Sequence, residues 1–232
     1  DEVDDNAVVC AVGTMGAPTV GVEKIPRGDE LEKTVRVLES HIGSSFEAII
    51  IGEIGGANAL KPLICALQMD LPVVDGDGMG RAFPELQMDS FAIGGIDLSP
   101  LALGDCHGNQ VVLHSVSGPV QAERYARNLT IEMGGSTALA MPMMTGHELK
   151  RTLIRKTLSL AKALGEIVLG ARKVGKDPVD GIIELTQGQV LFRGKIIDVE
   201  RRITRGFSRG TMKLTAFGSQ EDQLEIHFQN EN

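Results

Sequence analysis

Three short apolar runs in the first part of the chain each predict a buried strand. They are residues 7–12 (AVVCAV), 47–52 (EAIIIG) and 71–75 (LPVVD). Continuous apolar runs of this length suit strands that are buried on both faces, as in a parallel sheet. Helical patterns at residues 30–42 and 58–69 separate the runs. The order strand–helix–strand–helix–strand therefore predicts a right-handed α/β sheet.

Each helical pattern carries an apolar stripe that we expect to face the sheet. In the first helix the stripe consists of Leu31, Val35, Leu38 and Ile42. In the second helix it consists of Leu60, Leu63, Ile64 and Leu67. Asn58 is expected to cap this second helix, because its side chain can accept a hydrogen bond from a free backbone N–H of the first turn.

The pattern changes after Phe91, where the period-2 signal becomes more frequent. The elements expected here are a hairpin (98–118), a helix (120–135), a strand (137–144) and a long amphipathic helix (145–174). Residues 188–232 alternate between polar and apolar and are punctuated by glycine, which predicts antiparallel strands packed on the α/β body. The expected fold is α/β, a parallel Rossmann-like sheet flanked by helices, with a C-terminal β-rich antiparallel subdomain. The expected domains are residues 1–176, carrying the site, and residues 177–232.

Composition and charge exclude several classes of partner. Aromatic residues make up only 3% of the chain and the formal net charge is −8, so we expect no nucleic-acid partner. No apolar stretch is long enough to span a membrane. The three cysteines lie far apart and form no CxxC motif, which favours a reducing compartment and a cytoplasmic protein. The chain lacks an initiator methionine, and we expect it to be a piece of a longer protein.

Three glycine-rich segments are expected beyond the carboxyl ends of the predicted parallel strands. They are residues 13–21 (GTMGAPTVG), 52–58 (GEIGGAN) and 73–85 (VVDGDGMGRAFPE). In open α/β sheets the ligand binds in the crevice at this edge. Glycines at alternate positions among charged residues indicate a backbone that approaches something closely. The alternative is an elaborate loop whose carboxylates only form caps and salt bridges.

Carboxylates at two strand ends suit proton transfer, a hard cation, or recognition of N–H donors on a ring. The catalytic candidates are Glu53, Asp75 and Asp77, which we expect to share one pocket with Arg81. Arg81 is expected either to clamp a substrate carboxylate or to pair with a neighbouring acid. It also breaks the GxGxxG motif, which disfavours a dinucleotide site. The further substrate-binding candidates are Met15, Gly16, Gly55, Gly56, Asn58, Gly78, Gly80 and Glu85.

Histidine and cysteine add weaker candidates outside this edge. Cys106 and His107 lie at the expected hairpin tip, where turn formation is the competing explanation. His147 follows Thr145, which is expected to cap a helix with Glu148. No HxxxH or HxH spacing occurs. The cofactor is unknown. A divalent metal ion would find its candidate ligands in Asp75, Asp77, His107 and His147.

Several long motifs together resemble the S-methyl-thiohydantoin-desulfurase-like family, and the resemblance covers essentially the whole chain. The motifs are GTMGAPTVGVEKIPRGDEL, EIGGANALKPL, LPVVDGDGMGRAFPELQM, EMGG, MTGHELKR, VLFRGKIIDVERR, GTMKL and FQNEN. The resemblance implies a two-part protein that hydrolyses the C–S bond of an S-methylated thiohydantoin, leaving a hydantoin and a thiol. It also implies that family members extend beyond both ends of this chain and often occur beside hydantoinase/oxoprolinase proteins.

Three functions follow from these observations. The first is a hydrolase with a small-molecule substrate, acting on a thiohydantoin or a related cyclic amide. The second is a non-catalytic partner or regulatory subunit of a hydantoinase/oxoprolinase-type enzyme, which a large exposed apolar patch near the sheet edge would favour. The third is a module that binds a small ligand or a metal without chemistry. A homo-oligomer is compatible with each of them.

Overall fold

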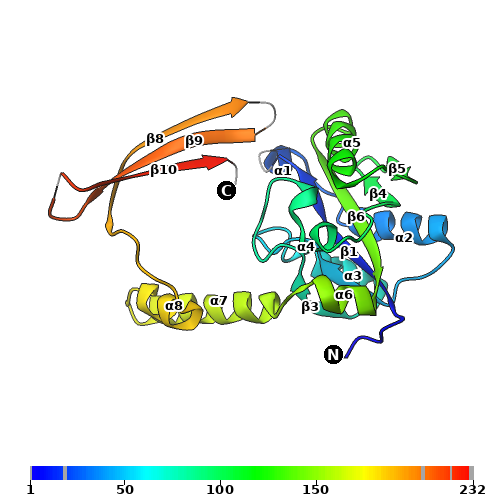
Figure 1. Ribbon diagram of the computed structural model, residues 1–232, viewed down its shortest axis with the longest axis horizontal. Coiled ribbons are helices and arrows are strands. Elements are labelled where there is room, and N and C mark those ends of the chain that lie inside the picture. The colour runs from blue at the N-terminus through cyan, green and yellow to red at the C-terminus, as the bar shows by residue number, and fades with distance from the viewer. Residues whose placement is uncertain (1, 18–19, 205–206, 220, 230–232) are drawn as a thin grey trace. The chain divides into compact units, whose positions relative to one another are not determined.

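Residues 2–17, 20–204, 207–219 and 221–229 are described by the computed structural model (Figure 1). The chain divides into two units, Asp1–Leu158 and Ser159–Asn232. The two units meet between Leu158 and Ser159. The predicted domain boundary at residue 176 stays a prediction.

The first unit is built on a sheet of seven strands in the order β5-β4-β6-β1-β2-β3-β7. Strands β1, β2 and β3 run parallel, as predicted, and the other neighbouring pairs are antiparallel. The elements are β1 (Val8–Gly16), α1 (Val20–Glu23), α2 (Glu30–Ile42), β2 (Ala48–Ile51), α3 (Lys61–Met69), β3 (Val73–Asp77), η1 (Leu86–Met88), α4 (Ser90–Ile93), β4 (Leu101–Gly104), β5 (Gln110–Leu113), α5 (Pro119–Glu132), β6 (Ser136–Thr145), α6 (Gly146–Thr152) and β7 (Ile154–Arg155).

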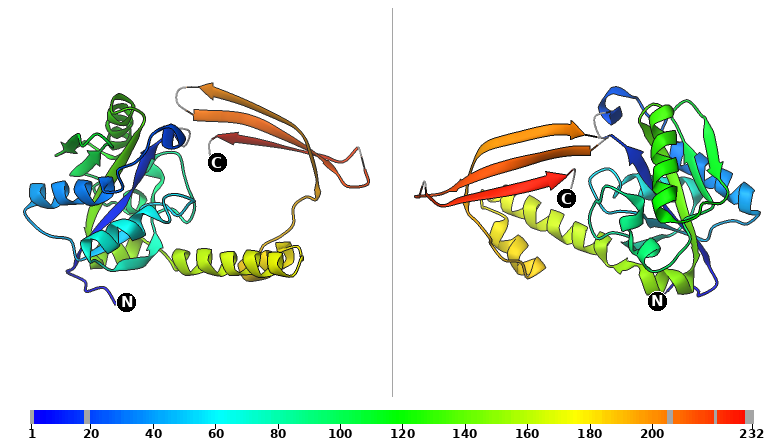
Figure 2. Two further views of the ribbon diagram at one scale, coloured as in Figure 1. Left: turned by 180° about the vertical axis from the view of Figure 1, so that it is seen from behind. Right: turned by 45° about the horizontal axis from the view of Figure 1, so that its top comes forward.

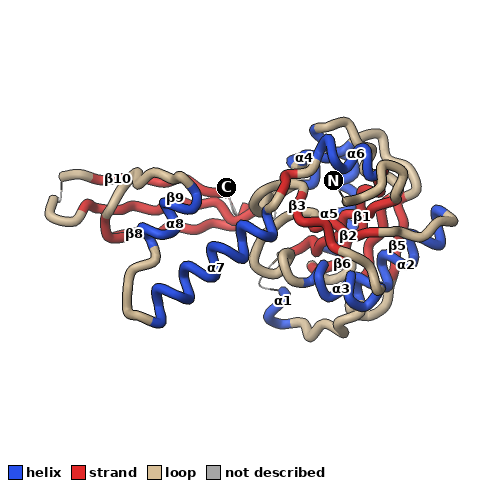
Figure 3. Tube along the Cα trace, turned by 90° about the horizontal axis from the view of Figure 1, so that it is seen from below, coloured by secondary structure: helices blue, strands red, loops and turns tan. Residues whose placement is uncertain are grey.

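Helices cover both faces of this sheet, so its central strands are buried on both sides. On one face, Cys10 and Ile49 pack with residues of α2 and α3. On the other, Val9 and Ile50 pack with Phe91 of α4 and with α6, while α5 covers the part of that face near β4 and β6. Figure 3 shows α4 and α6 on one side of β1–β3 and α3 on the other. The continuous apolar runs of β1 and β2 are explained by this two-sided burial.

The prediction for α3 was wrong about the stripe that faces the sheet. The stripe that we expected to be buried is exposed, with exposed fractions of 62% for Leu60, 36% for Leu63, 51% for Ile64 and 82% for Leu67. The buried residues of this helix are Pro62, Cys65, Ala66 and Met69. The segment KPLICALQM is apolar around most of its circumference, so periodicity alone did not select a face. Asn58 does not cap the helix either, because the N-cap position is Leu60.

The long helix predicted for residues 145–174 is interrupted. Thr145 and Glu148 form the expected capping box at the start of α6, but that helix ends at Thr152 and the short strand β7 follows. The two residues of β7 pair with Gly76 and Asp77 of β3. This strand pairing outweighs the local helix propensity of the segment. Lys156, which follows β7, has a left-handed conformation (φ 63°).

The second unit contains a separate sheet of three antiparallel strands in the order β10-β9-β8. Its elements are α7 (Thr157–Lys173), which begins at the boundary, α8 (Val179–Thr186), β8 (Gly194–Thr204), β9 (Phe207–Ala216) and β10 (Gln223–Gln229). Figure 2 shows the three strands side by side. The predicted antiparallel β subdomain is confirmed, whereas its packing on the α/β body stays a prediction. In the part of the chain that the structure describes, no helix is long and apolar enough to cross a membrane.

Candidate functional site

The loop after β2 is tied to the end of β1 by Asn58. Its side-chain Oδ1 accepts hydrogen bonds from the backbone N–H of Thr14 (2.9 Å) and from the Thr14 hydroxyl (2.6 Å). Its Nδ2 donates to the Thr14 carbonyl oxygen (3.1 Å) and to Glu53 (2.7 Å). Asn58 is buried, and its amide is fixed in orientation because both of its polar ends have partners.

Glu53 is the carboxylate that this network presents at the sheet edge. Its Oε1 accepts the hydrogen bond from Asn58, and its Oε2 accepts a hydrogen bond from the backbone N–H of Phe83 (3.1 Å). The side chain therefore connects the loop after β2 to the loop after β3. Glu53 is half-buried. It can accept a proton or a hydrogen bond from a ligand at this edge.

Asp77 is the last residue of β3. It is fully buried, with an exposed fraction of 0%. Its carboxylate accepts hydrogen bonds from the backbone N–H groups of Ile54 (2.8 Å), Met79 (3.2 Å) and Gly80 (2.8 and 3.0 Å). These donors come from both loops, so Asp77 holds the two loops together. Replacement of Asp77 is therefore expected to lower the stability of the folded chain as well as to affect any reaction at this edge.

Two of the alternating glycines are required by close packing. A Cβ on Gly76 would lie 2.6 Å from Leu153 Cδ1 and 2.8 Å from the carbonyl oxygen of Ile154. A Cβ on Gly78 would lie 2.6 Å from Phe91 Cε2 and 2.8 Å from the carbonyl oxygen of Gly52. The close approach that the glycine spacing predicted is therefore an approach to other parts of the protein. Nothing lies within 4 Å of the corresponding position on Gly56.

The remaining candidates of the third loop are only partly brought together. Asp75 is exposed, and its backbone carbonyl oxygen accepts a hydrogen bond from Lys156 N–H (2.9 Å) on the side of β7. The Arg81 guanidinium lies over the Phe83 ring, 5.4 Å from its centroid. Phe83 is thus in contact with both candidates, through its ring with Arg81 and through its backbone N–H with Glu53. Glu85 accepts a hydrogen bond from Gln87.

Two substrate-binding candidates at the end of β1, Met15 and Gly16, pack against other residues of the protein. The Met15 side chain is buried in the hydrophobic core with Leu139 and Met141. Gly16 (φ 139°) lies against Gly135, whose carbonyl oxygen would be 2.2 Å from an added Cβ. Gly55 faces Ala82, whose Cβ would lie 3.6 Å away. These positions shape the loops.

The candidate metal ligands do not form a metal site. Thr145 pairs with Val8 at the start of β1, so His147 lies at the sheet edge opposite to the one that carries Asp77. His107 lies at the tip of the β4–β5 hairpin. Both oxygens of Asp77 are already engaged by N–H donors. Among the described residues, no group of three or more histidine, cysteine or acidic side chains is arranged to hold a metal ion.

The hairpin tip is organised by Asp105. Its carboxylate accepts hydrogen bonds from the backbone N–H groups of His107 and Asn109 (2.9 Å each) and from the Asn109 side chain (2.7 Å). Burial acts to raise the pKa of Asp105, but these hydrogen bonds outweigh it and lower the pKa. This arrangement is typical of a turn, and it accounts for the DCHGN sequence without chemistry at Cys106.

Sequence reasoning missed several side chains that support the third loop. The Glu123 carboxylate of α5 accepts a hydrogen bond from Leu86 N–H (3.1 Å) and one from Arg127 Nε (2.7 Å). Arg127 also donates to the Pro84 carbonyl oxygen (2.8 Å). The i,i+4 spacing of Glu123 and Arg127 is compatible with an ion pair on a helix surface. Its contact with residues 84–86 depends on the tertiary fold.

Asp89 is a second missed residue, and it is buried at the start of α4. Its carboxylate caps that helix by accepting a hydrogen bond from Ala92 N–H. Burial raises the pKa of Asp89 to about 6, although backbone hydrogen bonds from Ala92 and Phe91 oppose the shift. The folded chain therefore binds this proton more tightly than the unfolded chain does. The stabilisation is complete below the unfolded pKa of about 4 and is lost as the pH rises through about 6.

Asp89→Asn is therefore expected to stabilise the protein at pH 7.5 by about 2 kcal/mol. Asparagine can still accept the hydrogen bond from Ala92 N–H, and it carries no charge that burial would penalise. At pH 4 the gain is expected to vanish, because the wild-type carboxyl is then protonated. Urea unfolding at the two pH values measures the difference, and equal gains at both would contradict it.

Comparisons with known proteins agree with this fold. Two family models match the sequence: S-Me-THD-like, N-terminal domain, over residues 1–115, and S-Me-THD-like, C-terminal domain, over residues 117–232. The resemblance seen in the motifs is thereby confirmed. A search of the curated proteins finds no match. A crystal structure of a protein from Chromobacterium violaceum is similar with a TM-score of 0.71 at 22% identity, covering 99% of this chain and 63% of that one. At this identity the likeness shows the fold alone.

Proposed function

The chain belongs to the S-Me-THD-like family, and we propose that it is a hydrolase of a hydantoin-like ring, acting by desulfuration of an S-methyl-thiohydantoin. The observation that supports this proposal is the Glu53 carboxylate. It is half-buried at the carboxyl edge of the parallel strands and held by Asn58 and Phe83 N–H. Ligands of open α/β sheets bind at this edge.

The proposed reaction consumes one water molecule. A new C–O bond forms between water and the ring carbon that bears sulfur, and the C–S bond of that carbon breaks. The two protons of water are distributed between the products, so that the ring becomes a hydantoin and the sulfur leaves as methanethiol. No oxidant or reductant is needed.

In this reaction Glu53 would accept a proton from the attacking water, as a general base. Asn58 would hold the Glu53 carboxylate in place, since its amide is fixed by three hydrogen bonds to Thr14. Asp77 would position the two loops, and Arg81, stacked on Phe83, would attract an anionic substituent of the ring. Asp75 is exposed, and we assign it no role in the step. No step is assigned to a metal ion, because the candidate ligands do not converge.

Incubation of the purified chain with an S-methyl-thiohydantoin is expected to release methanethiol at a rate proportional to protein concentration. Colorimetric detection of the free thiol and chromatographic detection of the hydantoin measure the two products independently. A one-to-one ratio of the products is expected. Release of neither product by an intact, folded chain would contradict the proposal, as would ring opening without thiol release.

The exposed stripe of α3 favours a second candidate function, that of a partner of a hydantoinase/oxoprolinase-type protein. Leu60, Ile64 and Leu67 are more than half exposed, and their helix directly follows the loop that carries Glu53. A contiguous apolar surface on a soluble domain is typical of a protein interface. A chain without turnover that binds a hydantoinase-type protein through this stripe would support the partner function. The three unpaired cysteines support our proposal that the protein acts in the cytoplasm.

A further inference from the structure

Two of the five histidines of the chain meet on the surface of the first unit, although they are 73 residues apart in the sequence. His41 Nε2 lies 2.9 Å from His114 Nδ1, and the planes of the two rings are inclined at 70°. Both side chains are exposed. One neutral imidazole donates its N–H to the ring nitrogen of the other. Such a bond adds little stability at the surface, because water can replace either partner.

Both histidines are held by elements that pack on the hydrophobic core. His41 lies in the last turn of α2, where Leu38 is buried, and His114 directly follows β5. Val112 of β5 packs against the same core cluster that contains Leu38. Helix α2 contacts both β4 and β5, and Figures 1 and 3 show it next to this hairpin. The backbone positions of the two histidines are therefore set by packing.

The histidine pair lies at the edge of the sheet opposite to the one that carries Glu53. Helix α2 leads into β2, so its last turn lies where the parallel strands begin. Strand β5 ends at Leu113, which pairs with Leu101, the first residue of β4. Strand β4 runs in the same direction as β1, because both are antiparallel to β6. The pair is thus separate from the proposed active site.

The distance between the two nitrogens suits neighbouring ligands of one metal ion. Two imidazole nitrogens that bind a metal at about 2.0–2.1 Å and at a right angle are roughly 2.9 Å apart. The His41–His114 nitrogen distance equals this value. The rings must turn so that both lone pairs point at the ion, and exposed side chains are free to do so.

The end of α2 is a second feature that favours a cation here. The last carbonyl groups of a helix give this end a partial negative charge, and His41 lies in the last turn. Among the described residues, no group of three or more histidine, cysteine or acidic side chains is arranged to hold a metal ion. The pair would therefore supply two ligands, and water would complete the coordination of the ion.

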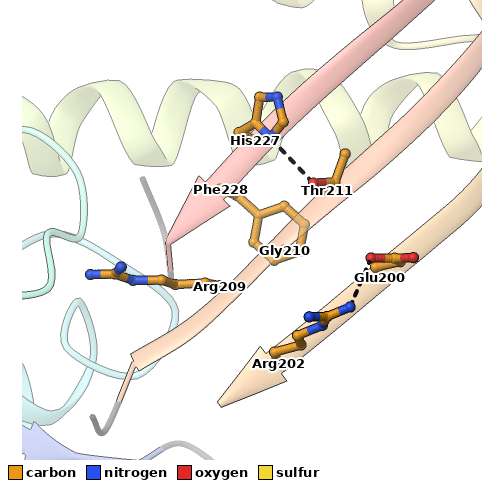
Figure 4. Close-up of a pocket in the computed structure, with 7 residues that line it drawn as sticks. All are labelled: Glu200, Arg202, Arg209, Gly210, Thr211, His227 and Phe228. Atoms are coloured by element: carbon orange, nitrogen blue, oxygen red, sulfur yellow. Dashed lines mark hydrogen bonds and ion pairs between the residues drawn. The ribbon is translucent and has the colours of Figure 1, made fainter. Parts of the chain in front are cut away.

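His227 has different neighbours and provides a comparison. Its Nδ1 lies 3.2 Å from the Thr211 hydroxyl (Figure 4), and its Nε2 lies 3.2 Å from the Glu225 carboxylate. The neighbours of His227 are thus a hydroxyl and a carboxylate, whereas His41 and His114 present two nitrogens to each other. Imidazole nitrogen suits Ni²⁺, Cu²⁺ and Zn²⁺, whereas carboxylate and hydroxyl oxygens suit harder cations.

We propose that His41 and His114 form a two-histidine site for a divalent transition-metal ion such as Ni²⁺ or Zn²⁺. The ion would replace the proton that the two nitrogens now share, and it would connect the end of α2 to the end of β5. Because the unfolded chain does not hold the two rings together, the ion would stabilise the folded chain. The proposal does not depend on the hydrolase activity, since neither histidine belongs to the Glu53 network.

The test is a calorimetric titration of the whole chain, without a histidine tag, with Ni²⁺. One saturable site is expected in the wild type. His41→Gln and His114→Gln each leave a single imidazole, so each variant is expected to bind Ni²⁺ at least about tenfold more weakly. Paramagnetic Ni²⁺ is expected to broaden the NMR ring signals of His41 and His114 first, and EDTA is expected to restore them. At saturation the melting temperature of the wild type is expected to rise by roughly 5 °C.

His227→Gln is the matched control, because it removes an exposed histidine that has a carboxylate neighbour. This control is expected to bind Ni²⁺ as the wild type does. In the presence of EDTA all three variants are expected to keep the circular dichroism and melting temperature of the wild type. The proposal is overturned if the wild type shows no saturable binding, or if Ni²⁺ broadens other signals first. It is also overturned if His41→Gln and His114→Gln bind Ni²⁺ as tightly as His227→Gln does.

Discussion

Replacement of Glu53 by glutamine is expected to lower the rate of thiol release by roughly a hundredfold or more. Glutamine has nearly the same shape as glutamate, but it cannot accept a proton from water at neutral pH. Its amide can also satisfy only one of the two N–H donors that now bind the carboxylate, those of Asn58 and Phe83. The measurement is kcat/KM as a function of pH.

Asp70→Asn is the matched control for this substitution. Asp70 is exposed in a left-handed conformation at the end of α3 (φ 56°), which asparagine also tolerates. Wild-type turnover is expected in this variant. Glu53→Ala separates chemistry from loop structure, because added formate can supply the missing carboxylate and is expected to restore part of the rate. Wild-type rates in Glu53→Gln would exclude Glu53 as the base.

Gly78→Ala is expected to destabilise the folded chain by about 3 kcal/mol. The added methyl group would overlap the ring of Phe91, which is fully buried, and the backbone oxygen of Gly52. That oxygen accepts the hydrogen bond from Gly78 N–H (3.0 Å), so relief of the overlap would separate the two loops of the site. The melting temperature is expected to fall by roughly 6 to 12 °C.

Gly56→Ala provides the comparison for Gly78→Ala. Gly56 has no atom within 4 Å of the added position and no left-handed φ, so its melting temperature is expected to stay within about 2 °C of the wild type. Both variants add the same methyl group and differ only in where it is added. A similar melting temperature for both would show that the contact between Gly78 and Phe91 can relax, contrary to the packing argument.

The sequence by itself predicted the elements whose pattern has one physical explanation. Continuous apolar runs predicted strands of a parallel sheet, and they located β1, β2 and β3. A single apolar stripe located α2 at residues 30–42, and the alternation of polar and apolar residues located the antiparallel strands of the second unit. Carboxylates at strand ends placed Glu53 and Asp77 at one edge, because parallel strands share their carboxyl edge.

Where the same residues were compatible with several local structures, only the tertiary structure determined which one forms. The segment of α3 is apolar on most sides, and packing buried Cys65 and Ala66 while leaving Leu60 and Leu67 exposed. Pairing with β3 converted the middle of a predicted helix into β7. The two carboxylates of the edge look equivalent in the sequence. Only the folded chain separates them, because three backbone N–H groups enclose Asp77 while Glu53 stays half-buried. The environment of a charged side chain depends on residues that are distant in the sequence, and a local sequence pattern does not identify those residues.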